Sequence, residues 1–298
     1  MSSKETKPPI LVPEHPTDND EPSDLPPPAY TTTGTPAVPI PLNPTALAPP
    51  FVPHTPFPST LTAYCIYELS VAGAKTLNVS SSPSLPLYNL EVHTGYSLSG
   101  PLGSRPGVIL HNGPSRKDPL LVAAGDESQT ASALYALNPR SVVLMPRIGG
   151  TNGELVEEMM HAVTVKTEKG VAFRWEIEVG QGEKVRREGF EWRKVKGGYV
   201  LVRYDGGDEK EGDEKAGEAL AELRWPKGLG WFKIGYTMEF KGAEMMGALG
   251  ERWTLMTIIT AARLMALKWN GKTTKGSVAL SEKARGKRKV EGSDSKAA

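Results

Sequence analysis

The chain has 298 residues, with 35 Lys and Arg against 34 Asp and Glu, so its formal net charge is +1 at pH 7. This balance gives no overall field for attracting nucleic acid, and we expect no specific nucleic-acid partner. The single cysteine, Cys65, excludes an intramolecular disulfide framework and a cysteine-based zinc site; we expect neither a metal nor a cofactor. The first ten residues, MSSKETKPPI, lack the apolar stretch of a secretory signal, which predicts a cytoplasmic protein.

Composition divides the chain into three segments. Residues 1–58 hold 17 of the 26 prolines, and their two Lys against six Asp and Glu give a net charge of −4. Because proline removes amide donors and this segment has little apolar surface, we predict a disordered, proline-rich arm. Residues 271–298, with eight Lys and Arg against three Asp and Glu, are predicted to form a disordered basic tail. The neutral residues 59–270 are then the globular domain.

Alternation with a period of two dominates this domain. In residues 171–179, apolar side chains alternate with Arg174, Glu176 and Glu178, and residues 232–240 and 61–69 show the same pattern. Such alternation buries one face of a strand and leaves the other in water. Glycine, proline, Asn and Asp separate most of these runs, as turns require. We therefore predict a mainly β fold of roughly twelve antiparallel strands, closed or nearly closed. In residues 158–167, we expect the lone His161 to be a packed core residue.

Residues 251–269 break the alternation. The segment ERWTLMTIITAARLMALKW contains no Gly or Pro and is apolar around nearly its whole circumference, which predicts a helix buried in a core or in lipid. Arg252, Arg263 and Lys268 interrupt the apolar run that a membrane span needs, so we favour a buried core helix.

Many antiparallel strands followed by one enclosed helix resemble the tubby C-terminal-like superfamily, in which a twelve-stranded barrel surrounds a hydrophobic helix. The matching features are the opening strand TAYCIYELS, the middle strands through VAFRWEIEV, and the final helix ERWTLMTIITAARLMALKW. The LURP-one-related and phospholipid scramblase-like branches, and fungal proteins of unknown function, are the most similar in arrangement. The resemblance covers about residues 59–270 and implies the barrel fold. It implies no catalytic residues, and no lipid-binding position can be transferred from it.

The arm contains a Pro-Pro-x-Tyr motif formed by Pro27, Pro28 and Tyr30. It resembles the ligands of group I WW domains, for which consecutive prolines supply a preformed polyproline II helix. The resemblance implies WW-domain partners such as HECT-type ubiquitin ligases. The alternative is a chance match within a proline-rich segment.

Two groups of cations are candidate binding sites. The tail carries five charges within seven residues, typical of a nuclear import signal, an anionic-lipid contact or a solvated tail. Six cations on neighbouring predicted strands could face a lipid or simply form a charged outer surface. The tail group is Lys283, Arg285, Lys287, Arg288 and Lys289, and the strand group is Arg186, Arg187, Arg193, Lys194, Lys196 and Arg203.

These observations favour a non-enzymatic interaction or adaptor protein that binds WW domains, as an adaptor or substrate of a ubiquitin ligase. The alternative is a peripheral protein that binds anionic lipids such as phosphoinositides, or a scramblase-like protein. No nucleophile–base set is visible in the sequence, and we expect no enzymatic activity. We expect a monomer in the cytoplasm, with a peripheral-membrane or nuclear location as the alternatives.

Overall fold

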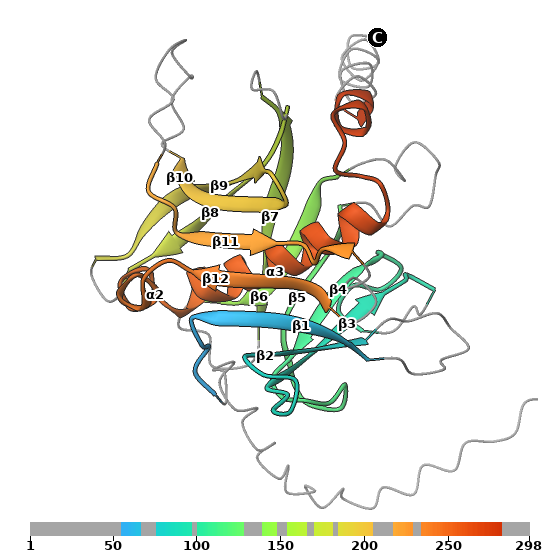
Figure 1. Ribbon diagram of the computed structural model, residues 1–298, viewed down its shortest axis with the longest axis vertical. Coiled ribbons are helices and arrows are strands. Elements are labelled where there is room, and N and C mark those ends of the chain that lie inside the picture. The colour runs from blue at the N-terminus through green and yellow to red at the C-terminus, as the bar shows by residue number, and fades with distance from the viewer. Residues whose placement is uncertain are drawn as a thin grey trace, which may run out of the picture. The chain divides into compact units, whose positions relative to one another are not determined.

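The computed structural model contains twelve strands and the helices α2 and α3, labelled in Figure 1, and residues 275–281 are also helical. The described residues are 55–66, 76–96, 100–127, 139–147, 154–165, 170–180, 184–204, 217–228 and 234–281. The strands are β1 (Thr60–Ile66), β2 (Thr76–Ser80), β3 (Tyr88–His93), β4 (Gly107–His111), β5 (Leu120–Asp126), β6 (Ser141–Pro146), β7 (Leu155–Thr164), β8 (Val171–Val179), β9 (Arg186–Val195), β10 (Gly198–Tyr204), β11 (Ala221–Arg224) and β12 (Ile234–Phe240), and the helices are α2 (Ala243–Leu249) and α3 (Glu251–Trp269).

The strands form one closed antiparallel barrel, which confirms the predicted fold class. Each strand pairs with the next along the chain, and β1 closes the barrel by pairing with β12, with Leu61 opposite Met238. Closure pairs every strand on both sides, so the barrel has no edge to which another strand could add.

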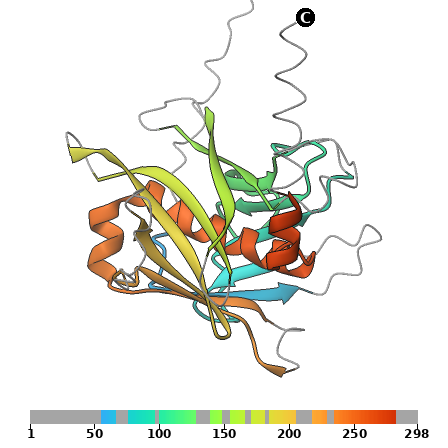
Figure 2. The ribbon, with the colours of Figure 1, turned by 90° about the horizontal axis from the view of Figure 1, so that it is seen from above.

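Helix α3 fills the barrel interior, as predicted for the apolar segment (Figure 2). All fifteen residues from Trp253 to Leu267 are buried. Eight strands enclose a space that side chains alone can fill, and twelve strands enclose a wider one. A helix whose whole circumference is apolar supplies the missing volume, and its own hydrogen bonds satisfy its backbone.

One bulge allows the helix to approach the barrel wall closely. The register of β1 and β12 shifts between Ala63 and Tyr64, opposite Gly235. A Cβ atom on Gly235 would lie 2.7 Å from Leu77 Cδ2 and 2.7 Å from Met265 Sδ of α3, well inside van der Waals contact. A larger residue at this position would have to displace the side-chain ends of Leu77 and Met265, so glycine lets the helix and the wall approach closely here.

We name the two ends of the barrel after the direction of α3, which begins at the entry end and finishes at the exit end. At the entry end, β12 finishes at Phe240 and α3 begins at Glu251; at the exit end, α3 finishes at Trp269. The antiparallel order places the β2–β3, β4–β5, β6–β7 and β8–β9 connections at the entry end. The β9–β10 turn and the end of β11 lie at the exit end.

The last residues of the predicted arm belong to the barrel. Phe57 stacks on Tyr88 with ring centroids 4.6 Å apart, and the Tyr88 hydroxyl donates a hydrogen bond to the carbonyl of Thr55. The Phe240 amide donates to the Ser59 carbonyl at 2.8 Å. The predicted boundary at residue 58 is therefore a few residues late, because Phe57 finds an aromatic partner at the entry end. Residues 1–54 lie outside the described part of the chain.

The predicted start of the basic tail at residue 271 is too early. Lys272 and Val278 are buried, and residues 275–281 are helical. The Ser277 amide donates to Thr274 Oγ1 at 3.2 Å, and the Thr274 amide donates to Ser277 Oγ at 3.2 Å, which caps this turn. Residues 271–281 therefore extend the domain, because Val278 adds to its core and Lys272 finds a carboxylate partner.

The expectation for His161 is wrong, because Met160 and Ala162 carry the inward parity of β7. His161 lies on the outer face, where its Nδ1 accepts a hydrogen bond from Arg140 Nε at 2.9 Å. Glu158 shares the parity of Met160 and is buried near the entry end. Because both faces of β7 carry apolar residues, the sequence does not show which of its alternate residues point into the barrel.

Candidate functional site

The binding residues predicted in the two tails lie outside the described part of the chain. This holds for Pro27, Pro28 and Tyr30 of the WW-binding motif and for Lys283, Arg285, Lys287, Arg288 and Lys289 of the basic segment. Within the described residues, polar side chains gather at both ends of α3, and the sequence had predicted neither cluster.

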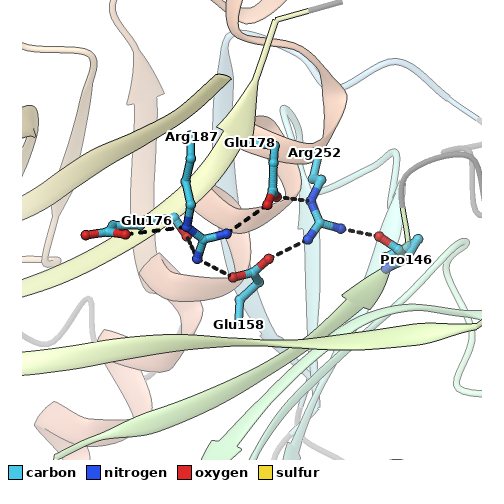
Figure 3. A network of polar contacts seen from close by, with 6 residues as sticks. All are labelled: Pro146, Glu158, Glu176, Glu178, Arg187 and Arg252. Atoms are coloured by element: carbon cyan, nitrogen blue, oxygen red, sulfur yellow. Dashed lines mark hydrogen bonds and ion pairs between the residues drawn. The ribbon is translucent and has the colours of Figure 1, made fainter. Parts of the chain in front are cut away.

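At the entry end, two arginines and two glutamates form a closed ring of alternating charge (Figure 3). Arg252 Nη2 lies 2.6 Å from Glu158 Oε1, and Arg187 Nη2 lies 2.9 Å from Glu158 Oε2. Glu178 completes the ring, with Arg187 Nη1 2.8 Å from its Oε1 and Arg252 Nε 3.3 Å from its Oε2. Arg252 also donates to the carbonyl of Pro146. The ring joins the start of α3 to strands β6, β7, β8 and β9.

Burial determines how strongly each member of the ring depends on its partners. The Glu158 side chain is 8% exposed and that of Arg252 is 14% exposed, whereas Arg187 is 47% exposed. Burial alone would raise the pKa of Glu178, but a backbone hydrogen bond and the charges of Arg252 and Arg187 bring it below its ordinary value. Burial opposes the charged form of Arg187, but Glu158 and Glu178 raise its pKa.

The lowered pKa of Glu178 predicts that acid weakens the ring. Ionised Glu178 stabilises the folded protein at pH values above its unfolded-state pKa, about 4.5. This stabilisation is lost as the pH falls through the lower pKa that Glu178 has in the folded state. Replacing Glu178 by Gln should therefore lower the thermal unfolding midpoint at neutral pH, and this difference should shrink below pH 4.5. Melting curves of both proteins across this range measure the effect. A constant difference at every pH would contradict an electrostatic role for Glu178.

At the exit end, one carboxylate serves two buried cations. Asp126, at the end of β5, accepts hydrogen bonds from the guanidinium of Arg263 and from Lys272 Nζ at 2.9 Å. Arg263 Nε also donates to Ser141 Oγ at 2.8 Å, and Arg263 Nη1 donates to the Pro106 carbonyl at 3.3 Å. Burial lowers the pKa of the Arg263 guanidinium, and Asp126 offsets part of that effect. This cluster fixes the end of α3 and the following residues to the barrel wall.

All four arginines singled out on the barrel wall form ion pairs with glutamates. Arg193 Nε lies 2.6 Å from Glu191 Oε1, and Arg203 Nε lies 3.2 Å from Glu188 Oε2. Arg186 forms an ion pair with the same Glu188 carboxylate. Together with Arg187 in the ring, four of the six strand cations are therefore in ion pairs. Lys194 and Lys196 are exposed and form no ion pair within the described residues. The wall of β9 and β10 is a charged outer face of mixed sign.

A third polar cluster lies on the outer face of β3 and β4. His111 Nε2 is 3.7 Å from Glu91 Oε2, and His111 Nδ1 lies 3.0 Å from the Asp118 carbonyl. Arg116, from the β4–β5 connection, reaches within 4.0 Å of the same carboxylate. The nearby His111 side chain, together with the charge of Arg116, outweighs burial and lowers the pKa of Glu91. This cluster attaches the β4–β5 connection to the wall.

Among the described residues, no three His, Cys, Asp or Glu side chains are grouped as metal ligands would be. None of the helices in the described ranges combines the length and the apolar character that a bilayer crossing requires. The fold defines a closed twelve-stranded antiparallel barrel around a central helix. Comparison with known proteins gives no match to any family model, curated protein or solved structure.

Proposed function

We propose that the protein is a non-enzymatic adaptor that presents a WW-domain ligand on an arm attached to a barrel. The observation that carries this proposal is the Pro-Pro-x-Tyr motif at residues 27–30, which precedes the first described barrel contact, Thr55, by 25 positions (30 to 55). Acidic residues, Glu21 and Asp24, precede the motif, and a third proline, Pro26, lies directly before it. The partners are WW-domain proteins, with HECT-type ubiquitin ligases as the leading class.

The length of the arm supports this function. A proline-rich segment of 25 residues can extend by up to about 75 Å, because polyproline II rises roughly 3.1 Å per residue. A WW domain could therefore bind the motif without contacting or unfolding the barrel. The anchor formed by Phe57, Tyr88 and Thr55 gives the arm a fixed origin at the entry end.

The architecture of the barrel also favours recognition through the arm. Its strands are paired on both sides, so it offers no edge for strand addition. Its interior is occupied by α3, from Trp253 to Leu267. A barrel of this kind serves as a stable scaffold, and a short linear motif outside it supplies the specificity.

Replacing Tyr30 by Ala should abolish capture of group I WW domains, since a small interface depends on a few aromatic and proline contacts. Phosphorylation of Tyr30 should act in the same direction, because a doubly charged group would enter a pocket suited to a phenol. Calorimetric titration of the full chain with a panel of WW domains measures this. The melting temperature serves as the control and should not change. Equal binding by both proteins, or no binding by either, would make the motif a chance match.

The alternative function, binding to an anionic lipid surface, needs unpaired cations. The ion pairs of Arg186, Arg187, Arg193 and Arg203 reduce the charge available on the wall of β9 and β10. On the barrel, this alternative therefore depends on cations at other positions.

A further inference from the structure

A single row of outward side chains crosses five neighbouring strands of the barrel wall. Glu127 directly follows β5 and Arg140 directly precedes β6, and the Glu127 amide donates to the Arg140 carbonyl at 3.4 Å. The β6–β7 register, extended by one residue, sets Arg140 opposite His161. His161 lies opposite Arg174 of β8, and Arg174 lies opposite Glu191 of β9. We call these five residues the ladder row.

The charges of the ladder row are symmetric about His161. On one side, Arg140 Nη1 lies 3.1 Å from Glu127 Oε1, and on the other, Arg174 Nε forms an ion pair with Glu191. The Glu191 side chain is 2% exposed, so water screens its charge little. His161 therefore lies between two arginines, each of which is paired with a glutamate.

The contact between His161 and Arg140 requires a neutral imidazole. His161 Nδ1 accepts a hydrogen bond from Arg140 Nε at 2.9 Å, and Arg140 Nη2 lies 2.5 Å from the same nitrogen. Arginine nitrogens can only donate, so Nδ1 must offer a lone pair and the imidazole proton must be on Nε2. A second proton, on Nδ1, would remove the acceptor and place a third positive charge between Arg140 and Arg174.

The other charged groups around His161 do not offset that charge. Within the described residues, His161 contacts no carboxylate. The nearest outward glutamates of β7 and β8 are already paired, Glu157 with Arg105 and Glu176 with Arg187. The remaining titratable groups beside the ladder row contact only its members on β8 and β9, and they are Arg193 and Tyr204.

The ladder row lies directly outside the cluster that holds the exit end of α3. Asp126 precedes Glu127 in the sequence, and Ser141 follows Arg140. Asp126 and Ser141 both accept hydrogen bonds from Arg263 on the inner side of the wall. The same short segments of β5 and β6 therefore carry one end of the outward row and the inward anchor of α3.

We propose that His161 is a pH sensor that loosens this part of the barrel in mildly acidic surroundings. Histidine takes up a proton between about pH 8 and pH 5. Protonated His161 releases Arg140, so the pairing of β6 with β7 weakens near the exit end. A closed barrel, which has no strand edge at neutral pH, would then expose the edges of β6 and β7.

His111, on the outer face of β4, provides a contrast. Its Nε2 lies 3.7 Å from Glu91 Oε2, so a proton on His111 gains a carboxylate partner. Acid should therefore strengthen the contact of His111 and weaken that of His161. The two histidines are a matched pair for testing the sensor.

Hydrogen exchange followed by mass spectrometry tests the proposal in the full chain. At about pH 7.5, peptides covering β6 and β7 should exchange at the same rate in the wild type and in His161→Gln, because the Gln carbonyl can also accept from Arg140. At about pH 5.5, the wild-type peptides should exchange about 10-fold faster, since one proton taken up on opening changes the opening constant by up to about tenfold per pH unit. Comparison at the same pH cancels the direct effect of pH on exchange.

Two further variants complete the test. His111→Gln should keep the full acid effect in β6 and β7. Arg140→Gln should reduce it, because the charge that opposes protonated His161 is gone, and this variant carries the test if His161→Gln does not fold. Equal exchange of the wild type and His161→Gln at about pH 5.5, an unchanged acid effect in Arg140→Gln, its loss in His111→Gln, or equal acceleration in β11 and β12 would each overturn the proposal.

Discussion

Replacing Ile258 by Asp should destabilise the barrel by about 4 kcal/mol or more and yield mostly insoluble protein. Ile258 is 1% exposed in the middle of α3, so an aspartate there would place a charge in an apolar interior without a partner. The midpoint of urea unfolding, or the soluble fraction where the variant does not fold, measures the effect.

Two controls separate burial from the substitution itself. Ile258→Val keeps the site apolar and should cost only about 1 kcal/mol. Val185→Asp places the same charge on a side chain that is 40% exposed, and should change stability by less than about 1 kcal/mol. A fully soluble Ile258→Asp protein with an unchanged melting temperature would show that α3 is not enclosed by the strands.

The second large effect concerns Asp126. Replacing it by Asn should cost about 3–5 kcal/mol, because the Arg263 guanidinium, 1% exposed, and the Lys272 ammonium, 9% exposed, would lose their shared counter-charge. Arg263→Met should cost less, although it removes a larger group, since it leaves Asp126 paired with Lys272. Denaturant unfolding of the two single variants gives the comparison.

The order of these two costs is the informative result. If Asp126→Asn and Arg263→Met are equally destabilising, the pairwise contact between Asp126 and Arg263 accounts for the effect. If Arg263→Met costs more, packing of the arginine side chain outweighs its charge. Only a larger cost for Asp126→Asn supports one carboxylate compensating two cations.

Much of the fold could be predicted from the sequence because two patterns were clear. The alternation from Val171 to Val179 identified a strand with one buried face, and the structure has β8 over those residues. The mostly apolar segment 251–269, which contains no Gly or Pro, identified the enclosed helix with the observed bounds. Both signals depend on local periodicity, which a single sequence contains.

The polar clusters could not be predicted, because they depend on which distant residues the strand register brings together. Glu158 and Arg252 are far apart in sequence and meet only where β7 passes the start of α3. A partial signal existed: an arginine inside an otherwise apolar helix, such as Arg263, requires a carboxylate partner if the helix is buried. The sequence indicates that a partner is needed but does not identify Asp126.

The predicted end of the domain at residue 270 is too early for the same reason, because the contacts of residues 271–281 are with residues distant in the sequence. Lys272 and Val278 lie in a polar, glycine-containing segment that has the composition of a tail. Their burial depends on Asp126 and on the barrel interior, which no local pattern reports.

The enclosed helix also constrains how the chain folds during synthesis. The interior of the barrel is filled by α3, which is made after all twelve strands, and β1 finds its second neighbour only when β12 has emerged. Until then, the nascent sheet exposes β1 as an open edge and carries an unfilled apolar face. Folding therefore awaits contacts between the two ends of the domain, a topology that favours slow folding and dependence on chaperones. A chain truncated before α3 would still contain the sequences of all twelve strands. It would lack the apolar helix against which their inner faces pack.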